Sequence, residues 1–330
     1  MDFAKKNGAG VIVGVGSALM DILGHEEHAF VEKAGGVLGG MVYVDGNHID
    51  SLLPSFATPP QVVPGGSACN TVVGVASLGG AGRFVGKAGN DHLGNQFIQG
   101  LEKYNVQPSV IRSGEPTGRV LSIVTPDAQR SMLTFLGASS SLDPLEVGAD
   151  VFEDASVVLV EGYLLFNRDL ITTALVNAKK SGAKVCLDLA AFTVVEHARD
   201  FLEDLVEKYV DILIANEDEA KAYTGLDNEE AALRKLAEKS EIGVLKVGER
   251  GSYILNQGQM TRVQPQTGGA VRDTTGAGDL WASGFLYGLV NDFSMEKSGR
   301  LGSACGHEVC QVMGAGIPEE GWRRIRALLD

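Results

Sequence analysis

A glycine-rich turn in the last third of the chain combines an anion-binding backbone with a carboxylate. The run 271–279 reads Val-Arg-Asp-Thr-Thr-Gly-Ala-Gly-Asp and leads into an apolar segment typical of a helix. Glycines turn the backbone sharply and leave N–H groups accessible, and a helix N-terminus adds partial positive charge. Such a nest suits phosphate oxygens, so the Asp279 carboxylate would repel the ligand unless it had a chemical task. We predict that it removes a proton from a hydroxyl that attacks the phosphate; a carboxylate that merely favours the helix dipole is the alternative.

A second polar cluster, Pro64-Gly-Gly-Ser-Ala-Cys-Asn70, places two glycines before a predicted helix and an asparagine on its first turns. A polar ligand can meet backbone amides at such a place. The alternative is an ordinary helix start with Asn70 facing solvent, and it is favoured when the cluster is taken alone.

A third cluster, Asn216-Glu-Asp-Glu219, follows the predicted strand 212–214. The carboxyl ends of parallel strands are where α/β sheets bind ligands, and one carboxylate is enough to hold a hydrated Mg²⁺. Acidic capping of the next helix is the alternative for Glu219. Another strand-end turn, Lys246-Val-Gly-Glu-Arg-Gly251, either lines a nucleotide pocket or is a plain β-turn.

Composition limits the class of protein. The 330 residues are 44% hydrophobic, which is ample for a core and excludes a disordered chain. This length favours one large α/β domain with a smaller appendage. The formal net charge of -14 argues against nucleic acid or an anionic membrane surface as a partner.

The cysteines and the N-terminus indicate a cytoplasmic protein. The four cysteines contain no CxxC pair and lie in apolar surroundings, so we expect buried thiols in a reducing compartment. The N-terminal residues lack the pattern of a secretory signal, and Asp21 interrupts their one long apolar stretch.

The second half of the chain alternates strands and helices. Short apolar runs at 157–160, 184–187, 212–214 and 243–246 leave room for a helix between each pair. This rhythm predicts a parallel sheet with helices on both faces. Residues 24–64 change character, and 120–136 read as a hairpin, so we expect a small β-rich part set apart from the core.

Common nucleotide fingerprints are absent from the sequence. There is no GxxxxGK[ST] motif, and the first strand's Gly14-Val-Gly16-Ser-Ala-Leu19 lacks the third glycine of a dinucleotide-binding turn. Phosphate binding is therefore expected at the late glycine turn.

Together, and in this order, the three clusters resemble the PfkB (ribokinase-like) family of carbohydrate and nucleoside kinases. Asp273-Thr-Thr-Gly-Ala-Gly-Asp279 is similar to the family's C-terminal signature, and Asn216-x-x-Glu219 to its metal-associated motif. The N-terminal signature is similar to Gly65-Gly66-x-x-x-Asn70 with Gly79, Gly80 and Gly86. The resemblance covers essentially the whole chain. It implies a Rossmann-type three-layer α/β/α core, in one domain of residues 1–330, with a β-rich lid formed by about 21–64 and 106–137.

The resemblance also implies roles for individual residues. Asp279 would be the base, Glu219 would hold Mg²⁺ through water, and ATP would be the phosphate donor, with K⁺ activation as a family tendency. One departure concerns Lys246, because many relatives carry Thr-x-Gly-x-x-Gly at 246–251. The remaining implied residues are Gly276, Ala277 and Gly278 for the anion hole, Asp21, Gly66 and Asn70 for the substrate, and Asn216, Lys246, Gly248 and Gly251 for ATP.

The run Arg130-Ser-Met-Leu-Thr-Phe-Leu-Gly-Ala138 resembles adenosine kinases, and bacterial adenosine-kinase-like members in particular, more than ribokinases or fructokinases. By this resemblance Arg130 reaches the transferred phosphate, where a planar cation suits developing charge. An arginine that solvates the hairpin turn near Asp127 is the alternative. We therefore expect transfer of the ATP γ-phosphoryl group to the 5′-OH of adenosine, by a monomer or homodimer. A ribokinase- or fructokinase-type sugar kinase and a catalytically silent ligand-binding sensor are the alternatives.

Overall fold

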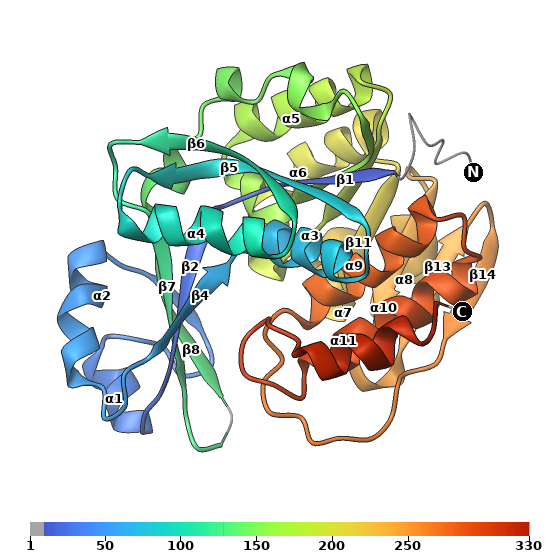
Figure 1. The fold of residues 1–330 in the computed structure, drawn as a ribbon. Coiled ribbons are helices and arrows are strands. Elements are labelled where there is room, and N and C mark those ends of the chain that lie inside the picture. The colour runs from blue at the N-terminus through green and yellow to red at the C-terminus, as the bar shows by residue number, and fades with distance from the viewer. Residues whose placement is uncertain (1–9, 128, 330) are drawn as a thin grey trace.

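The chain folds into a large α/β body with a smaller sheet projecting from one side (Figure 1). The computed structural model describes residues 10–127 and 129–329. Within these residues, no helix combines the length and the apolar character that crossing a membrane requires.

The large sheet is parallel except at one edge. Its strand order is β14-β13-β12-β11-β10-β9-β1-β5-β6, and β13 and β14 are antiparallel to their neighbours. The central strand β9 is buried at every position, as expected for a parallel strand covered on both faces. The strands are β1 (Val11–Val15), β5 (Ala81–Gly89), β6 (Val106–Ser113), β9 (Ala155–Glu161), β10 (Lys184–Asp188), β11 (Ile212–Asn216), β12 (Ile242–Lys246), β13 (Ser252–Asn256) and β14 (Gln259–Val263).

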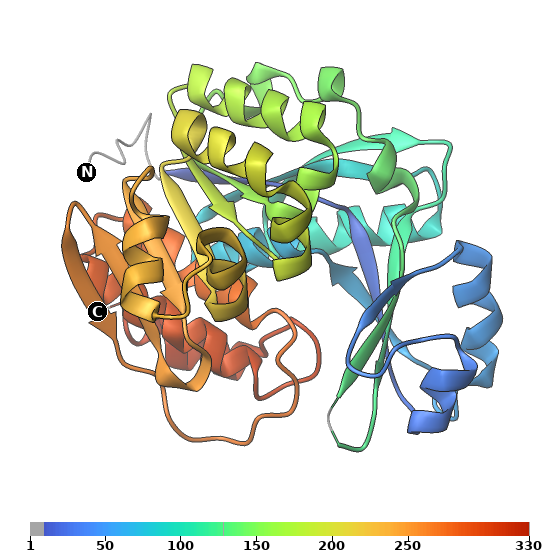
Figure 2. The same cartoon turned by 180° about the vertical axis from the view of Figure 1, so that it is seen from behind.

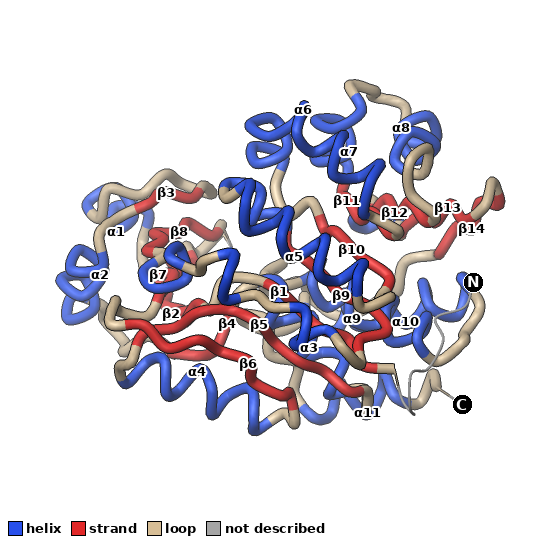
Figure 3. The backbone as a smooth tube through the Cα atoms, turned by 90° about the horizontal axis from the view of Figure 1, so that it is seen from above, coloured by secondary structure: helices blue, strands red, loops and turns tan. Residues whose placement is uncertain are grey.

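Helices cover both faces of this sheet, which confirms the predicted three-layer α/β/α fold. One face packs against α5 (Arg168–Lys180), α6 (Phe192–Tyr209), α7 (Glu217–Thr224) and α8 (Glu229–Leu236). The other face lies against α3 (Ser67–Ser77), α4 (His92–Lys103), α9 (Ala277–Val290) and α10 (Met295–Val309). Helix α11 (Glu319–Arg326) packs against α10 in a further helical cluster. Figure 3 shows the strands between these two helical layers, and Figure 2 shows α5 and α6 on the rear face. Short 3-10 helices are η2 (Gly137–Ser141), η3 (Pro144–Glu146), η4 (Ala149–Phe152), η5 (Gly162–Phe166) and η6 (Gly248–Arg250).

The projecting part, which we call the lid sheet, has five strands in the order β3-β8-β7-β2-β4. Its own small core includes Ile22, Leu121 and Leu133 under two short helices. Its elements are β2 (Leu19–His25), α1 (His28–Lys33), β3 (Met41–Tyr43), α2 (Gly46–Leu52), η1 (Leu53–Ser55), β4 (Gln61–Gly65), β7 (Gly118–Val124) and β8 (Arg130–Phe135).

The lid boundary expected at residue 106 requires a correction. Residues 106–113 form β6, which pairs in parallel with β5 from Gly82↔Val106 to Gly89↔Ser113. The backbone N–H and C=O groups of this segment therefore complete the edge of the large sheet, and the second lid segment starts with β7.

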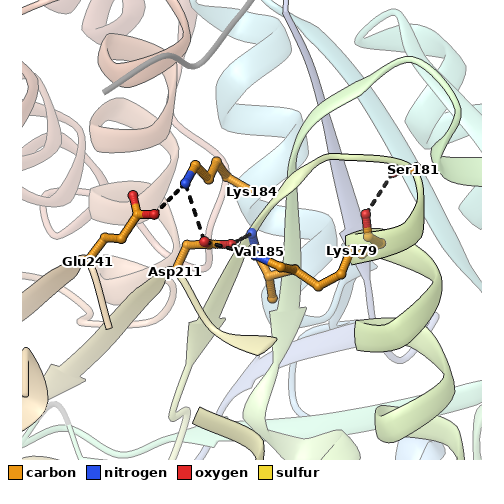
Figure 4. A network of polar contacts seen from close by, with 7 residues as sticks. Lys179, Ser181, Lys184, Val185, Asp211 and Glu241 are labelled. Carbon is orange, nitrogen blue, oxygen red and sulfur yellow. Dashed lines mark hydrogen bonds and ion pairs between the residues drawn. The ribbon is translucent and has the colours of Figure 1, made fainter. Parts of the chain in front are cut away.

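A buried carboxylate ties the amino ends of three central strands together. Asp211 accepts hydrogen bonds from Lys179 Nζ at 2.8 Å and from the Val185 N–H at 2.8 Å (Figure 4). Lys184, the first residue of β10, lies between Asp211 and Glu241 and contacts both. This network lies at the edge of the sheet opposite the carboxyl ends of the strands, where the candidate site is found.

Candidate active site

Asp279 lies on the first turn of α9, facing the N-terminal turns of α3. Ser67 Oγ donates to its Oδ1 at 2.7 Å, and Asn70 Nδ2 donates to its Oδ2 at 2.9 Å. The Thr71 hydroxyl also donates to the Asp279 carbonyl oxygen, at 3.1 Å. Two helix starts more than 200 residues apart in sequence therefore hold one carboxylate at both of its oxygens.

Burial raises the pKa of Asp279 above its ordinary value, while the hydrogen bonds from Asn70 and Ser67 act in the opposite direction. Burial disfavours the charged form, and donors to the carboxylate favour it. The net result is a carboxylate that is more basic than an exposed aspartate and has a fixed orientation. Both properties suit a group that accepts a proton.

The turn that precedes Asp279 needs glycine at position 276 and has little free space at position 278. Gly276 has φ +73°, and a Cβ there would lie 2.7 Å from the Ala315 Cβ. A Cβ on Gly278 would lie 3.0 Å from the Lys246 Nζ. The turn thus brings its backbone close to a lysine ammonium.

Lys246 ends β12 and reaches Asp188 at the end of β10. Its Nζ lies 3.0 Å from Asp188 Oδ2, and the two side chains are only 14% and 8% exposed. Burial alone would lower the pKa of Lys246, but the charges of Asp188 and Glu219 raise it above its ordinary value. The lysine is therefore a permanent cation beside the glycine turn.

Glu219 forms a capping box with Asn216 at the start of α7. Asn216 donates to both carboxylate oxygens, from its backbone N–H and from Nδ2, each at 2.8 Å. Burial raises the pKa of Glu219 to about 7, the charge of Lys246 opposes this rise, and Asp188 adds to it. The structure therefore contains the helix-capping arrangement weighed as the alternative to a metal site.

This donor set fits a hydrated Mg²⁺ better than a directly ligated one. Both oxygens of Glu219 are already engaged, and no group of three His, Cys, Asp or Glu gathers as metal ligands in residues 10–127 and 129–329. Mg²⁺ retains several waters and takes much of its coordination from phosphates, so contact through water suffices.

Asp21, on lid strand β2, lies against the glycine pair that precedes α3. A Cβ on Gly65 would fall 2.3 Å from the Asp21 carboxyl carbon, so glycine makes room for this side chain. Burial raises the pKa of Asp21 to about 7, against the charge of Arg130 and with that of Asp279. Gly66 has φ +97°, and a Cβ there would lie 2.4 Å from the Ser17 carbonyl oxygen.

Arg130 begins lid strand β8 and contacts the glycine turn. Its guanidinium donates to the Thr275 hydroxyl, which donates to Asp273 Oδ1 at 2.6 Å. Asp127 is the alternative partner expected for Arg130 at the hairpin turn. Its carboxylate lies 3.1 Å from His28 Nε2 and accepts a hydrogen bond from the Thr125 hydroxyl. Arg130 thus joins the lid sheet to the turn that carries Asp279.

Gly248 and Gly251 shape the tight turn between β12 and β13. Gly251 has φ +94°, and a Cβ there would lie 2.2 Å from the Val263 carbonyl oxygen. The Gly251 N–H donates to the Gly248 carbonyl oxygen at 3.1 Å. Both glycines therefore have a structural reason in the turn, and their contact with ATP stays a prediction.

Sequence reasoning missed two buried acids at strand ends. Glu161, at the end of β9, accepts from the backbone N–H groups of Ser17 at 2.8 Å and Ala68 at 3.2 Å. Burial raises its pKa to about 7. Asp188 ends β10 in the same way. The rule used for Asn216–Glu219, that polar residues at carboxyl ends of parallel strands face the site, would have found both.

A three-layer α/β body with a projecting small sheet and a carboxylate in a glycine turn defines a ribokinase-like phosphotransferase. The family model of the pfkB family carbohydrate kinases matches residues 57–321, and the chain belongs to this family. It is an ATP-dependent phosphotransferase with an alcohol group as acceptor. ATP and Mg²⁺ are general requirements of this kinase family.

The chain is similar to both sugar and nucleoside kinases. It is 31% identical over 255 residues to the 5-dehydro-2-deoxygluconokinase of Bacillus subtilis, covering 73% of this chain and 78% of that one. The solved adenosine kinase of Sinorhizobium meliloti is 31% identical with a TM-score of 0.88, over 97% of this chain and 100% of that one. A solved "probable sugar kinase" of Rhizobium etli is 32% identical with a TM-score of 0.88, over 97% and 99%.

Proposed function

We propose that this enzyme transfers the γ-phosphoryl group of ATP to the 5′-hydroxyl of adenosine or a closely related ribonucleoside, with Asp279 as the base. The observation that carries the proposal is the Asp279 carboxylate, held by Ser67 and Asn70 at the mouth of the glycine turn. A protein that only bound ligand would have no use for a base at this position, which disfavours the sensor alternative.

In the reaction, the oxygen of the substrate hydroxyl forms a bond to the γ-phosphorus of ATP. Asp279 takes the proton that this hydroxyl loses. The bond between that phosphorus and the bridging oxygen breaks, and its electron pair leaves with ADP. Asp21 accepts hydrogen bonds from the acceptor's other hydroxyls, with Asn70 and the Gly66 backbone beside it, and so fixes which hydroxyl faces Asp279.

The developing negative charge meets positive groups on two sides. We assign the anion hole at the N-terminus of α9 to the backbone N–H groups of Gly276, Ala277 and Gly278. The Ala277 N–H donates to the Thr274 carbonyl oxygen at 3.2 Å and must turn away from it to meet phosphate. Lys246 lies beside Gly278, and Arg130 approaches the same turn from the lid sheet. Such preorganised charge stabilises a phosphoryl transition state more than the bound substrate.

Mg²⁺ bound with ATP would neutralise phosphate charge, and Glu219, oriented by Asn216, would hold it through water. Asn216 itself, Gly248 and Gly251 are assigned to the ATP side of the site by the family resemblance. K⁺ activation stays a prediction of that resemblance, and activity in K⁺ compared with tetramethylammonium salts measures it.

Adenosine is proposed as acceptor because the run 130–138 resembles adenosine kinases, and Arg130 at its start joins the lid sheet to the glycine turn. Similarity to the adenosine kinase of Sinorhizobium meliloti over nearly the whole chain supports this choice. A sugar or sugar acid is the second candidate, and similarity to the Bacillus subtilis 5-dehydro-2-deoxygluconokinase favours it.

An acceptor panel tests the proposal. ADP formation with adenosine, inosine, ribose, fructose, tagatose and 5-dehydro-2-deoxygluconate is followed in a coupled assay, and products are identified by mass spectrometry. The proposal expects adenosine to give the highest kcat/KM and 5′-AMP as the product. A sugar with the highest kcat/KM establishes the second candidate instead. ADP formation with none of them, together with ligand-induced thermal stabilisation, would establish the sensor.

A further inference from the structure

The Lys246–Asp188 pair bridges strands that are not neighbours in the sheet. Lys246 ends β12 and Asp188 ends β10, and β11 lies between them. Two strand spacings amount to about 10 Å. The pair therefore passes over the end of β11, and its ammonium lies beside Gly278 at the glycine turn.

The Lys246–Asp188 pair and the backbone beside it have features that cost folding free energy. A buried ion pair is weak evidence for stability, because desolvation offsets the attraction between the charges. Asp188 Oδ1 also accepts from the Ala190 N–H at 3.2 Å, and Ala190 has φ +64°, a conformation that a residue with a side chain seldom adopts. Strain of this kind gathers at functional sites, where the surrounding structure maintains a particular geometry.

Three carboxylates from three elements act on the Lys246 ammonium: Asp188 from β10, Glu219 from α7 and Asp279 from α9. Of these, Asp188 accepts a hydrogen bond from Nζ, at 3.0 Å. An ammonium has three N–H donors, so this bond leaves two for another acceptor. Since Nζ lies over Gly278, these donors are close to the predicted anion hole.

We propose that Asp188 is a positioning residue, which holds the Lys246 ammonium at the glycine turn so that it meets the phosphoryl group in transfer. This inference rests on the proposed phosphoryl transfer at Asp279. Lys246 contacts the phosphate, and Asp188 acts through Lys246. A flexible lysine placed by a buried carboxylate provides a fixed charge, which is what electrostatic stabilisation of a transition state requires.

The test compares Asp188→Asn, Lys246→Met and the double variant in the full-length enzyme, using the best acceptor of the wild type. Asp188→Asn should lower kcat about 10- to 100-fold with little change in KM for ATP, since displacement by about 1 Å can cost this much. In the Lys246→Met background, Asp188→Asn should cause no further loss of kcat. Asp188→Glu keeps the charge and should retain more kcat than Asp188→Asn. It also serves as the second probe if the asparagine variant does not fold.

Asp211→Asn is the matched control. It also removes a buried carboxylate paired with lysine, but at the opposite edge of the sheet. It should lower the melting temperature while leaving kcat unchanged. Wild-type kcat in Asp188→Asn, or an equal loss of kcat in the presence and absence of Lys246, overturns the positioning role. The proposed function is judged separately, because its failure would appear as a wild-type enzyme that phosphorylates no acceptor.

Discussion

Asp279 combines two requirements of a base, which are a raised pKa and a fixed orientation. Burial supplies the first, and the Ser67 and Asn70 hydrogen bonds supply the second at a modest cost in basicity. The same two donors, one on each oxygen, limit rotation of the carboxylate.

Asp279→Asn should abolish turnover while nearly preserving nucleotide binding. The amide is almost isosteric, and the Ser67 hydroxyl can rotate from donor to acceptor, so the helix starts should remain together. Loss of a general base costs about 10²–10⁴-fold in kcat. Steady-state kinetics and calorimetric titration with ATP measure the two effects. More than a tenth of wild-type kcat in this variant would contradict the base assignment. Ser67→Ala, which keeps the carboxylate and removes one donor to it, should cause a smaller loss.

The pH dependence of kcat/KM should have an acid limb with an apparent pKa near 7. Burial raises the pKa of Asp21 to about 7, and in the proposed function its ionised form accepts hydrogen bonds from substrate hydroxyls. Activity should therefore increase as pH rises through this value, and the apparent pKa belongs to the coupled pair Asp21 and Asp279. Asp21→Asn should lower kcat/KM and move the limb to lower pH, because the remaining limb belongs to Asp279, whose pKa the Asp21 charge no longer raises. A profile that is flat between about pH 5.5 and about pH 8 would refute this role.

The starts of α3 and α9 form the scaffold of the site. Glu161, at the end of β9, accepts the N–H groups of Ser17 and Ala68 and thereby ties the start of α3 to the loop before β2. Gly66 precedes this helix with φ +97° and close contact to the Ser17 carbonyl oxygen. The position of Ser67 and Asn70 thus depends on backbone contacts that a side chain at Gly66 would disrupt.

Gly66→Ala should lower both stability and kcat. The backbone conformation of Gly66, with φ +97° and ψ 136°, costs a residue with a side chain about 1–3 kcal/mol. The Cβ would also lie 2.4 Å from the Ser17 carbonyl oxygen, which forces the start of α3 to shift. Gly79→Ala is the matched control, because Gly79 has φ +93° and open space around a Cβ. It should cost about 1 kcal/mol in the free energy of unfolding and leave kcat unchanged. Chemical denaturation and steady-state kinetics separate the two effects; equal kcat in both variants would show that the start of α3 does not position the site.

At the scale of the whole molecule, the site gathers several carboxylates whose ionised form is destabilised by burial. Asp21, Glu161 and Glu219 each have a pKa raised to about 7, mainly by burial. The unfolded chain ionises these groups near their ordinary values of 3.8 and 4.5. The native state therefore binds more protons than the unfolded state in the interval between these values, and stability falls as pH rises through it.

The free energy of unfolding of the ligand-free protein should accordingly decrease between about pH 4.5 and about pH 7. Each group contributes at most about 1.4 kcal/mol per pH unit, and the decline should stop above the native pKa values. Carboxylates with lowered pKa, such as Asp91 and Asp154, act at lower pH and leave this interval unaffected. Urea denaturation at several pH values measures the slope, and Asp21→Asn should reduce it. A stability that rises through this interval would contradict burial as the dominant cause.

The sequence by itself determined the class of fold and most of the chemistry. Alternating apolar runs and helices predict a parallel sheet covered on both faces, because hydrophobic periodicity is a local property of the chain. The glycine turn, Asp279, Asn70 and Glu219 are recognisable for a similar reason, since each belongs to a short motif with its own backbone requirements.

The tertiary structure alone decided which residues meet. Ser67 contacts Asp279 across 212 residues of sequence, and Asp188 contacts Lys246 across 58. The segment 106–113 joined the large sheet because the free edge of β5 was available to it, which no local pattern specifies. Partners of this kind, and the pKa values that burial creates, depend on which strand ends and helix starts converge in space.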